Sequence, residues 1–200
     1  MTTIHIGNTE TRPVTYNTNR NLTIIGNTGT GKNYLIKNLI KQYAEKGFKI
    51  SILDHTQGAD FKNEENTNVY IEKEKWGQTI EKLAMELENE SSENQHLIVI
   101  PLYDTIKLEL EENDPEQLEQ FNTTLRKLIQ KSQPNNIQFM FGLIKANYVD
   151  EIITEAGGLT IVMDNRNLKE LIPDTEDKIG LGTGVLIDQT NNTKEKISLV

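Results

Sequence analysis

The stretch that decides the fold is TIIGNTGTGKNYLI, which runs from Thr23 to Ile36. Residues Gly26 to Lys32 match the pattern GxxxxGK directly after a strand-like segment and directly before apolar residues at helical spacing. In this context the pattern predicts a phosphate-binding loop. Glycines let the backbone wrap around an anion, the N–H groups at the start of a helix point at it, and the lysine reaches the outer phosphates.

We therefore predict that ATP is bound by nine consecutive residues: Gly26, Asn27, Thr28, Gly29, Thr30, Gly31, Lys32, Asn33 and Tyr34. At the last motif position a Ser or Thr hydroxyl normally contacts Mg²⁺, but this chain has Asn33. Its amide oxygen could ligate the metal directly or through water, or the side chain could cap the helix. The sequence leaves both open, so Mg²⁺ is expected to bind weakly or indirectly.

The apolar run LIVIPLYD, 97–104, is the strand that should carry acidic residues in a hydrolysing site of this layout. By strand length those residues fall on Pro101 and Leu102, which can neither bind metal nor accept a proton. Asp104 is the nearby candidate, either as a displaced metal ligand or, as the favoured interpretation, as a helix N-cap. Nucleotide binding is thus expected, hydrolysis stays open, and no catalytic residue is assigned.

Three further charged positions receive structural interpretations. Asp54 closes the strand ISILD and is expected at the rim of the site, with His55 beside it as a polar loop residue. Arg126 is expected on the solvated face of a helix rather than as an arginine finger.

Composition narrows the class of protein. Two hundred residues suit one domain, 1–200. Twenty-one basic against 30 acidic residues give a formal charge of −9, which argues against nucleic acid as a partner. The chain has no cysteine, so a disulfide or a thiolate metal site is excluded. No run approaches the roughly 18 apolar residues of a membrane span, so we expect no membrane insertion by this chain.

Strand-like and helix-like segments alternate along the chain. The expected strands are 21–26, 48–54, 97–103, 137–144 and 159–163, the expected helices are 33–46, 76–87, 118–129 and 148–155, and 184–200 resembles a hairpin. Five polar segments, NTETRP, NEENTN, NESSENQ, EENDPEQ and KSQPNN, are expected to be loops. Repeated βα units predict an α/β fold of the RecA-like P-loop NTPase type, with a mostly parallel sheet, helices on both faces and a short C-terminal hairpin.

Several segments follow the order seen in the FtsK/SpoIIIE-like translocase superfamily. They are NLTIIGNTGTGKNYLIKNLI, KISILDHTQGADF, LIVIPLYD, NNIQFMFGLIKANYVDEII and IGLGTGVLI, which together span 21–187. Within that superfamily the short, acidic, Asn-rich chain resembles the C-terminal, third ATPase domain of the type VII secretion coupling proteins EssC and EccC. It departs from the superfamily at Pro101 and Leu102 and at Phe141 to Leu143, where a sensor Gln is expected.

The resemblance implies one degenerate ATPase domain, cytoplasmic, within a larger membrane-anchored chain. It implies neighbouring ATPase domains of the same chain and secreted helical-hairpin (WXG100-like) proteins as partners, with a higher-order oligomer in the full assembly. Two alternatives stay open: an active motor translocating protein or DNA, with Asp104 or Asp54 replacing the absent acid, and a small P-loop phosphotransferase.

Overall fold

The computed structural model describes residues 2–56, 60–61, 67–71, 75–89, 94–132, 134–188 and 190–199. Its strands are β1 (Thr3–Asn8), β2 (Pro13–Asn17), β3 (Leu22–Ile25), β4 (Lys49–Leu53), β5 (Thr67–Tyr70), β6 (His96–Ile100), β7 (Ile137–Leu143), β8 (Leu159–Val162), β9 (Thr183–Asp188) and β10 (Thr193–Leu199). Its helices are α1 (Lys32–Glu45), α2 (Trp76–Glu88), α3 (Tyr103–Asn113), α4 (Pro115–Ser132), the 3-10 helix η2 (Ala146–Tyr148), α5 (Glu151–Ala156) and α6 (Asn165–Leu171). Among these residues no helix is long and apolar enough to cross a membrane.

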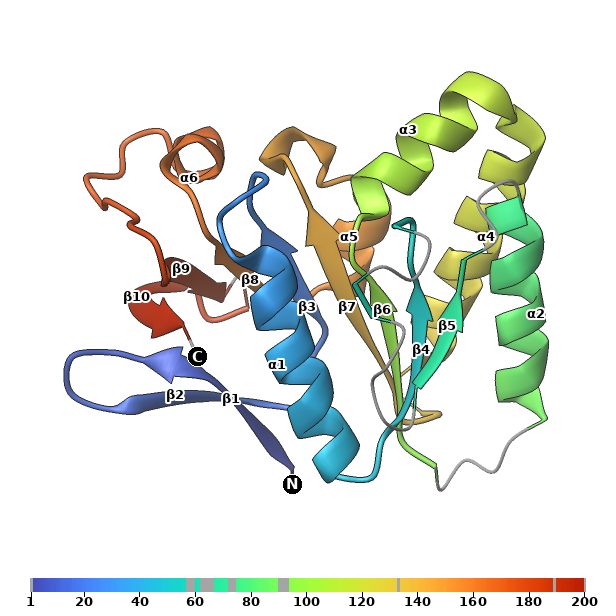
Figure 1. The fold of residues 1–200 in the computed structure, drawn as a ribbon, viewed down its shortest axis with the longest axis horizontal. Helices are drawn as coiled ribbons and strands as arrows, with labels where there is room; N and C mark the ends of the chain where they lie inside the picture. Colours follow the sequence, from blue (N-terminus) through green and yellow to red (C-terminus); the bar gives the residue numbers. More distant parts are fainter. Residues whose placement is uncertain are drawn as a thin grey trace.

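Within the described residues the strands form one ten-stranded sheet in the order β2-β1-β10-β9-β8-β3-β7-β6-β4-β5 (Figure 1). The six strands from β8 to β5 in that order pair in parallel. Strands β3, β6 and β7 are buried at every residue, as expected for parallel strands covered on both faces. The predicted α/β fold with a mostly parallel sheet is confirmed.

The rest of the sheet is antiparallel and consists of two hairpins. The C-terminal hairpin of β9 and β10 pairs with β8, and its presence was predicted. The N-terminal hairpin of β1 and β2 pairs with β10 and was not predicted. The segment NTETRP, expected to be a loop, contributes Asn8 and Pro13 as paired strand residues on either side of the turn.

Arg20 fastens the C-terminal hairpin to the parallel strands. Its two terminal nitrogens each donate to a carboxylate oxygen of Asp188, the last residue of β9, at 2.7 Å. It also donates to the carbonyl oxygen of Gly158, just before β8, at 3.2 Å. Such a two-pronged, charge-assisted pair is geometrically specific. The hydrogen bond from Arg20 holds the pKa of Asp188 well below its usual range.

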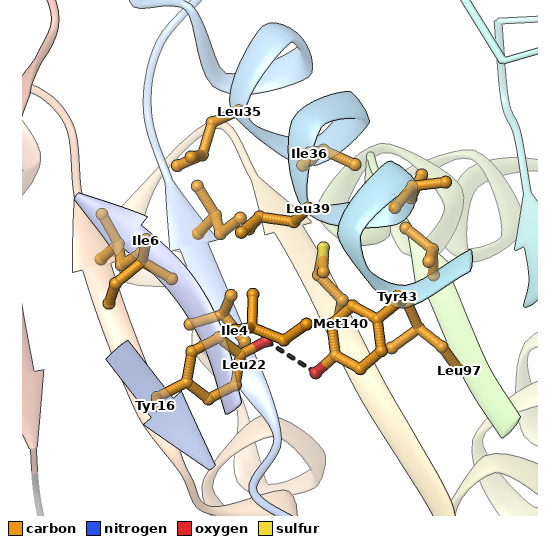
Figure 2. Packing of buried hydrophobic residues seen from close by; sticks show 14 of the residues in the cluster. Ile4, Ile6, Tyr16, Leu22, Leu35, Ile36, Leu39, Tyr43, Leu97 and Met140 are labelled. Atoms are coloured by element: carbon orange, nitrogen blue, oxygen red, sulfur yellow. Dashed lines mark hydrogen bonds between the residues drawn. The ribbon is translucent and has the colours of Figure 1, made fainter. Parts of the chain in front are cut away.

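Among the described helices, α1 is the one that covers the first face of the sheet. Leu35, Ile36 and Leu39 of α1 pack against Leu22 of β3 and against the N-terminal hairpin, which contributes Ile4 (Figure 2). The hydroxyls of Tyr16 and Tyr43 form a buried hydrogen bond of 2.7 Å between the hairpin and the helix. Burial raises the pKa of both phenols, so neither carries charge at neutral pH.

The opposite face packs against α2, α3, α4 and α5. Trp76 of α2 and Phe121 of α4 are fully buried there, and the parallel rings of Phe139 and Phe141 on β7 have centroids 5.6 Å apart. Helices therefore cover both faces, as predicted (Figure 1). The two layers fix the position of β3, and hence of the loop that follows it.

Two local expectations were wrong. The segment EENDPEQ is helical on both sides of Asp114, because α3 ends at Asn113 and α4 begins at Pro115. Proline is favoured at the first helical position, and Asp114 accepts the amide of Gln117 as an N-cap does. The helix expected over 148–155 is divided: η2 ends at Tyr148, and α5 begins at Glu151. Residues 62–66, 90–93 and 133, in or beside other expected loops, lie outside the described residues.

Candidate functional site: a phosphate loop without its acidic partners

The candidate site opens at the carboxyl end of β3, in the middle of the parallel strands. In open α/β sheets this edge is where ligands bind. The amide of Gly26 donates to the carbonyl of Leu143 at 3.0 Å, which ties the start of the loop to β7. The loop then turns directly into α1, so its geometry is held at both ends.

The loop has the backbone conformation of an anion nest. Gly29 and Gly31 have φ values of 86° and 90°, in the left-handed region that side chains disfavour. The hydroxyl of Thr30 donates to the carbonyl of Asn27 at 2.9 Å and closes the turn. Helix α1 begins with Gly31 as its N-cap and without a side-chain cap, so its first amides and its positive dipole end face the cavity.

A cavity of about 440 Å³ lies against this loop, and it is lined by Gly26, Asn27, Thr28, Gly29, Gly31, Lys32, Asn33, Tyr34, Leu102 and Ile144. Its volume falls within the range of about 300–1,000 Å³ that small-molecule sites occupy. Apart from Thr30, all the residues predicted to bind nucleotide line it. Tyr34 is 68% exposed, so its ring is accessible at the mouth.

Lys32 lies folded into the interior. It is 6% exposed, and its Nζ donates to the carbonyl oxygen of Pro101 at 3.0 Å. Burial lowers the pKa of Lys32 to about 8, although the negative charges of Asp104 and Asp60 oppose that shift. The ammonium is therefore still mostly charged at pH 7, but its proton is held less firmly than that of an exposed lysine.

Pro101 and Leu102 directly follow β6, at the position where the sequence predicts that acidic residues are missing. This corner contributes a backbone carbonyl to Lys32 instead of a carboxylate. The carbonyl packs tightly on β7, because a Cβ added to Gly142 would lie 2.2 Å from the oxygen of Pro101. Glycine is required there by close approach rather than by an unusual φ.

Asp104 is not the N-cap that the sequence favoured. Leu102 is the N-cap of α3, and Asp104 is the second residue of the helix, 2% exposed. Its Oδ2 accepts the amides of Ile144 at 2.6 Å and Lys145 at 3.2 Å, and its Oδ1 accepts the amide of Thr105. The cap expectation was wrong because the carboxylate reaches across to the end of β7. Metal ligation by Asp104 stays a prediction.

Asn33 does not cap its helix either, because Gly31 occupies that position. The Nδ2 of Asn33 instead donates to Oδ2 of Asp60 at 2.7 Å. Asp60 was missed in the sequence, where it lies in the segment GADF after the strand ISILD. Nothing in its spacing from the phosphate loop indicates the contact. Metal ligation by Asn33 also stays a prediction.

Asp164 and Asn167 were also missed. Oδ2 of Asp164 accepts the amide of Asn27 at 3.0 Å, while its Oδ1 caps α6 by accepting the amide of Asn167. Asn167, 1% exposed, bonds the carbonyl of Ile144 and the amide of Ala146. Together they join the phosphate loop to the ends of β7 and β8. An Asp between a strand and helix-spaced apolar residues was the available signal.

The remaining sequence candidates lie elsewhere. Asp54 is fully buried, accepts from the amide and hydroxyl of Thr56, and is not among the lining residues, so it is not at the rim. His55 contacts Oε2 of Glu109 at 2.6 Å. Arg126 is on the exposed side of α4, as expected, and donates to Glu151.

A magnesium ion would find few protein ligands here. Among the described residues, no group of three or more His, Cys, Asp or Glu side chains is placed to hold a metal ion. Mg²⁺ in nucleotide sites, however, keeps several waters and uses only one or two protein oxygens together with the phosphates. The amide of Asn33 and the carboxylate of Asp60 supply oxygens of that kind beside the loop. The donor set therefore fits Mg²⁺ that is bound mainly through nucleotide.

No protein-family model matches the sequence, and no curated protein matches it at a significant level. Solved structures do match over nearly the whole chain. The pCW3 conjugation coupling protein TcpA, in a monomer form with ATPγS, is 13% identical with a TM-score of 0.82, covering 98% of this chain and 65% of that one. EccC (ATPases 2 and 3) from Thermomonospora curvata, in complex with a signal sequence peptide, is 14% identical with a TM-score of 0.76, covering 99% and 40%.

The genome packaging NTPase B204 from Sulfolobus turreted icosahedral virus 2, in complex with sulfate, is 15% identical with a TM-score of 0.68, covering 92% of this chain and 98% of that one. Fold and site together thus define a domain with the RecA-like P-loop NTPase fold. The similar structures are ATPases of the FtsK/SpoIIIE type, EccC among them, which confirms the predicted resemblance at the level of the fold. The chain spans less than two thirds of the length of TcpA and less than half of that of EccC.

Proposed function

We propose that this chain is an ATP-binding, degenerate ATPase module of a type VII secretion coupling protein. The observation that carries the proposal is the left-handed backbone at Gly29 and Gly31, with the uncapped first residues of α1 lining a cavity of about 440 Å³ beside Lys32. Triphosphate binding needs backbone donors and a cation, and the site has both in the uncapped start of α1 and in Lys32. When nucleotide binds, the Nζ of Lys32 exchanges its hydrogen bond to the carbonyl of Pro101 for one to a phosphate oxygen.

Degeneracy is inferred from the corner after β6. Hydrolysis needs a carboxylate that holds the water shell of the metal and orients the attacking water. Pro101 and Leu102 offer neither function. Mg²⁺, when bound with ATP, would neutralise phosphate charge, and Asn33 and Asp60 are the residues of this chain that would face it. We therefore propose a module that binds nucleotide but hydrolyses it slowly or not at all.

The coupling role rests on similarity and charge. EccC was solved with a signal sequence peptide, and its ATPase domains match this chain over 99% of its length. A net charge of −9 disfavours a polyanion as cargo. We extend the proposal to one domain over 1–200 within a larger chain tethered to the cytoplasmic face of a membrane. Its partners would be neighbouring ATPase domains and secreted helical-hairpin proteins, in a higher-order oligomer.

A second candidate is an active motor that moves DNA or protein. Its support is the match to TcpA, a conjugation coupling protein solved with ATPγS, at a TM-score of 0.82. Steady ATP turnover by the isolated chain, lost in Lys32→Ala, would favour the motor. Turnover that appears only with DNA added would favour a nucleic-acid cargo.

The test of the first proposal is a calorimetric titration with ATP, with and without Mg²⁺, alongside thermal unfolding. Nucleotide that binds only the folded state raises the unfolding temperature. Absence of both heat and thermal shift at millimolar ATP would refute nucleotide binding. A pull-down of purified secreted helical-hairpin proteins, with and without ATP, then tests the coupling role.

A further inference from the structure

Asp60 is the one polar residue of the segment between β4 and β5 that the structure places against the phosphate loop, among the residues described there. Its Oδ2 accepts from Nδ2 of Asn33 at 2.7 Å, and Asn33 is the second residue of α1. That helical position is where a P-loop normally presents a metal-binding hydroxyl. The hydrogen bond thus places a carboxylate from the segment after β4 beside the residue at that position.

The next residue fixes Asp60 in place. Phe61 is fully buried in the core cluster beneath α1, and Nζ of Lys37 lies 5.7 Å from the centre of its ring. Asn33 and Lys37 are one helical turn apart and so share a face of α1. The helix therefore holds this segment at two adjacent points, Asp60 through a hydrogen bond and Phe61 through packing.

Among the described residues, Asp60 and Asp104 are the acidic groups whose negative charge raises the pKa of Lys32, and their surroundings differ. Asp104 is 2% exposed and uses both oxygens to accept backbone amides of α3 and of the segment after β7. Asp60 is only partly buried, and its contact within the described residues comes from a side-chain amide through one oxygen. A side-chain amide can rotate away from a carboxylate at little cost, whereas the backbone amides that hold Asp104 are fixed by the fold.

We propose that Asp60 is the metal-facing carboxylate of the nucleotide site, in place of the acid missing after β6, with Asn33 as the residue that positions it. The inference rests on the proposed binding of nucleotide. In the bound state Asp60 accepts hydrogen bonds from waters of the Mg²⁺ shell or ligates the ion directly. Either contact makes nucleotide affinity depend on the metal through this residue.

The test compares nucleotide affinity with excess Mg²⁺ and with chelator, by calorimetry with ATPγS. We expect the wild-type chain to bind about tenfold more tightly with Mg²⁺, which corresponds to about 1.4 kcal/mol. In Asp60→Asn the ratio should fall to about one or two, with affinity in chelator unchanged or slightly raised because a negative charge facing the phosphates is gone. Asparagine has nearly the same size, so Asn33 and Phe61 keep their contacts.

Two matched variants make the comparison specific. Asp174→Asn removes the same charge at an exposed turn and should keep the wild-type ratio. Asp104→Asn tests the other carboxylate and should lower stability while leaving the ratio close to wild type. The electron paramagnetic resonance spectrum of Mn²⁺ with ATPγS gives a second readout: Asp60→Asn should reduce the protein-bound fraction.

A wild-type ratio in Asp60→Asn, with an unchanged Mn²⁺ spectrum, would overturn the role of Asp60 and leave nucleotide binding standing. The role of Asp60 would also be overturned if Asp104→Asn, rather than Asp60→Asn, abolished the dependence of ATPγS affinity on Mg²⁺. Failure of the wild-type chain to bind ATPγS under any condition would instead refute the proposed function.

Discussion

Two strand-to-helix corners lie at the same edge of the sheet, on either side of β7, and they differ in which functional groups they keep. At the corner between β3 and α1, Gly29 and Gly31 keep the left-handed turn that exposes backbone amides. At the corner between β6 and α3, Pro101 and Leu102 stand where acidic residues are expected, and the backbone of that corner accepts the lysine. The backbone geometry of the first corner is thus independent of acidic side chains at the second.

Removing the cation should have the largest effect. Lys32→Ala deletes a charged hydrogen-bond donor to phosphate, which is worth about 1.5–3 kcal/mol, so affinity for ATP should fall about 10- to 100-fold. The thermal protection by ATP should vanish with it. Equal protection of the variant would mean that the two corners do not meet at the nucleotide. Calorimetry measures the affinity of both chains for ATP, and thermal unfolding at several ATP concentrations measures the protection.

The pH dependence of ATP affinity tests Lys32, whose Nζ joins the two corners by its hydrogen bond to the carbonyl of Pro101. Lys32 in the free protein has a pKa of about 8, and a bound polyphosphate anion raises it. The complex therefore holds more protons than the free chain above pH 8, so affinity should be flat below pH 8 and fall about tenfold per unit above it. Proton uptake is measured by titration at pH 8.5 in two buffers of different ionisation enthalpy. A phosphoryl group with a second pKa of about 6 contributes little there.

The same group affects folding with the opposite sign. Between pH 8 and 10.5 the unfolded chain retains the Lys32 proton more than the folded chain does, so the free energy of unfolding should rise with pH through that window. Lys32→Ala should lack this rise. Urea unfolding of both chains at pH 7.5 and 9.5 measures the difference. A parallel response of the two chains would contradict the burial of the ammonium.

Two glycines with similar backbone angles, Gly29 in the phosphate loop and Gly47 after α1, distinguish a loss of stability from a loss of nucleotide binding. Gly29 and Gly47 have φ values of 86° and 84°, and a Cβ at either would meet nothing within 4 Å. Alanine at either position should cost about 1–2 kcal/mol of stability. Only Gly29→Ala should also weaken ATP binding, by about fivefold, since it distorts the nest. Equal ATP affinity in both variants would mean that the nest is not used.

Returning an acid to the second corner should have the smallest effect. Leu102 lines the cavity and is the N-cap of α3, a position that favours Asp. We expect Leu102→Asp to weaken ATP binding about threefold in chelator, by charge repulsion, and to recover affinity with Mg²⁺. Leu102→Asn is the neutral control and should show no metal effect. Titrations with and without chelator measure both.

The phosphate loop was predictable because its requirements are local. Glycine placement, the lysine and the flanking strand and helix all lie within one short stretch, and the structure keeps them together. The parallel strands were equally readable, since burial on both faces leaves continuous apolar runs such as that of β6. The hairpin of β1 and β2 was missed because polar residues occupy its turn and its exposed positions, so neither strand is a continuous apolar run.

The polar partners of the site were missed for a different reason. Asp60 contacts Asn33 from 27 residues away, and Asp164 contacts Asn27 from 137 residues away. Asn167 acts through Asp164 and the segment after β7. Single polar side chains in loops carry no periodic signal. Asp104 was noticed because it follows an apolar strand, but its role depends on how close the end of β7 lies. These contacts depend on which strands are neighbours in the sheet, and the sequence pattern does not show that order.

The clamp at Arg20 has a mechanical consequence. Arg20 lies two residues before β3, and it grips both the end of β9 and the carbonyl that precedes β8. Strand β9 also pairs with β8, and β8 pairs with β3, so Arg20 adds a charged link to the connection that the sheet already makes between the hairpin and the base of β3. A displacement of the C-terminal hairpin would therefore move the base of β3 through strands and this ion pair, and substitution of Arg20 would loosen that connection.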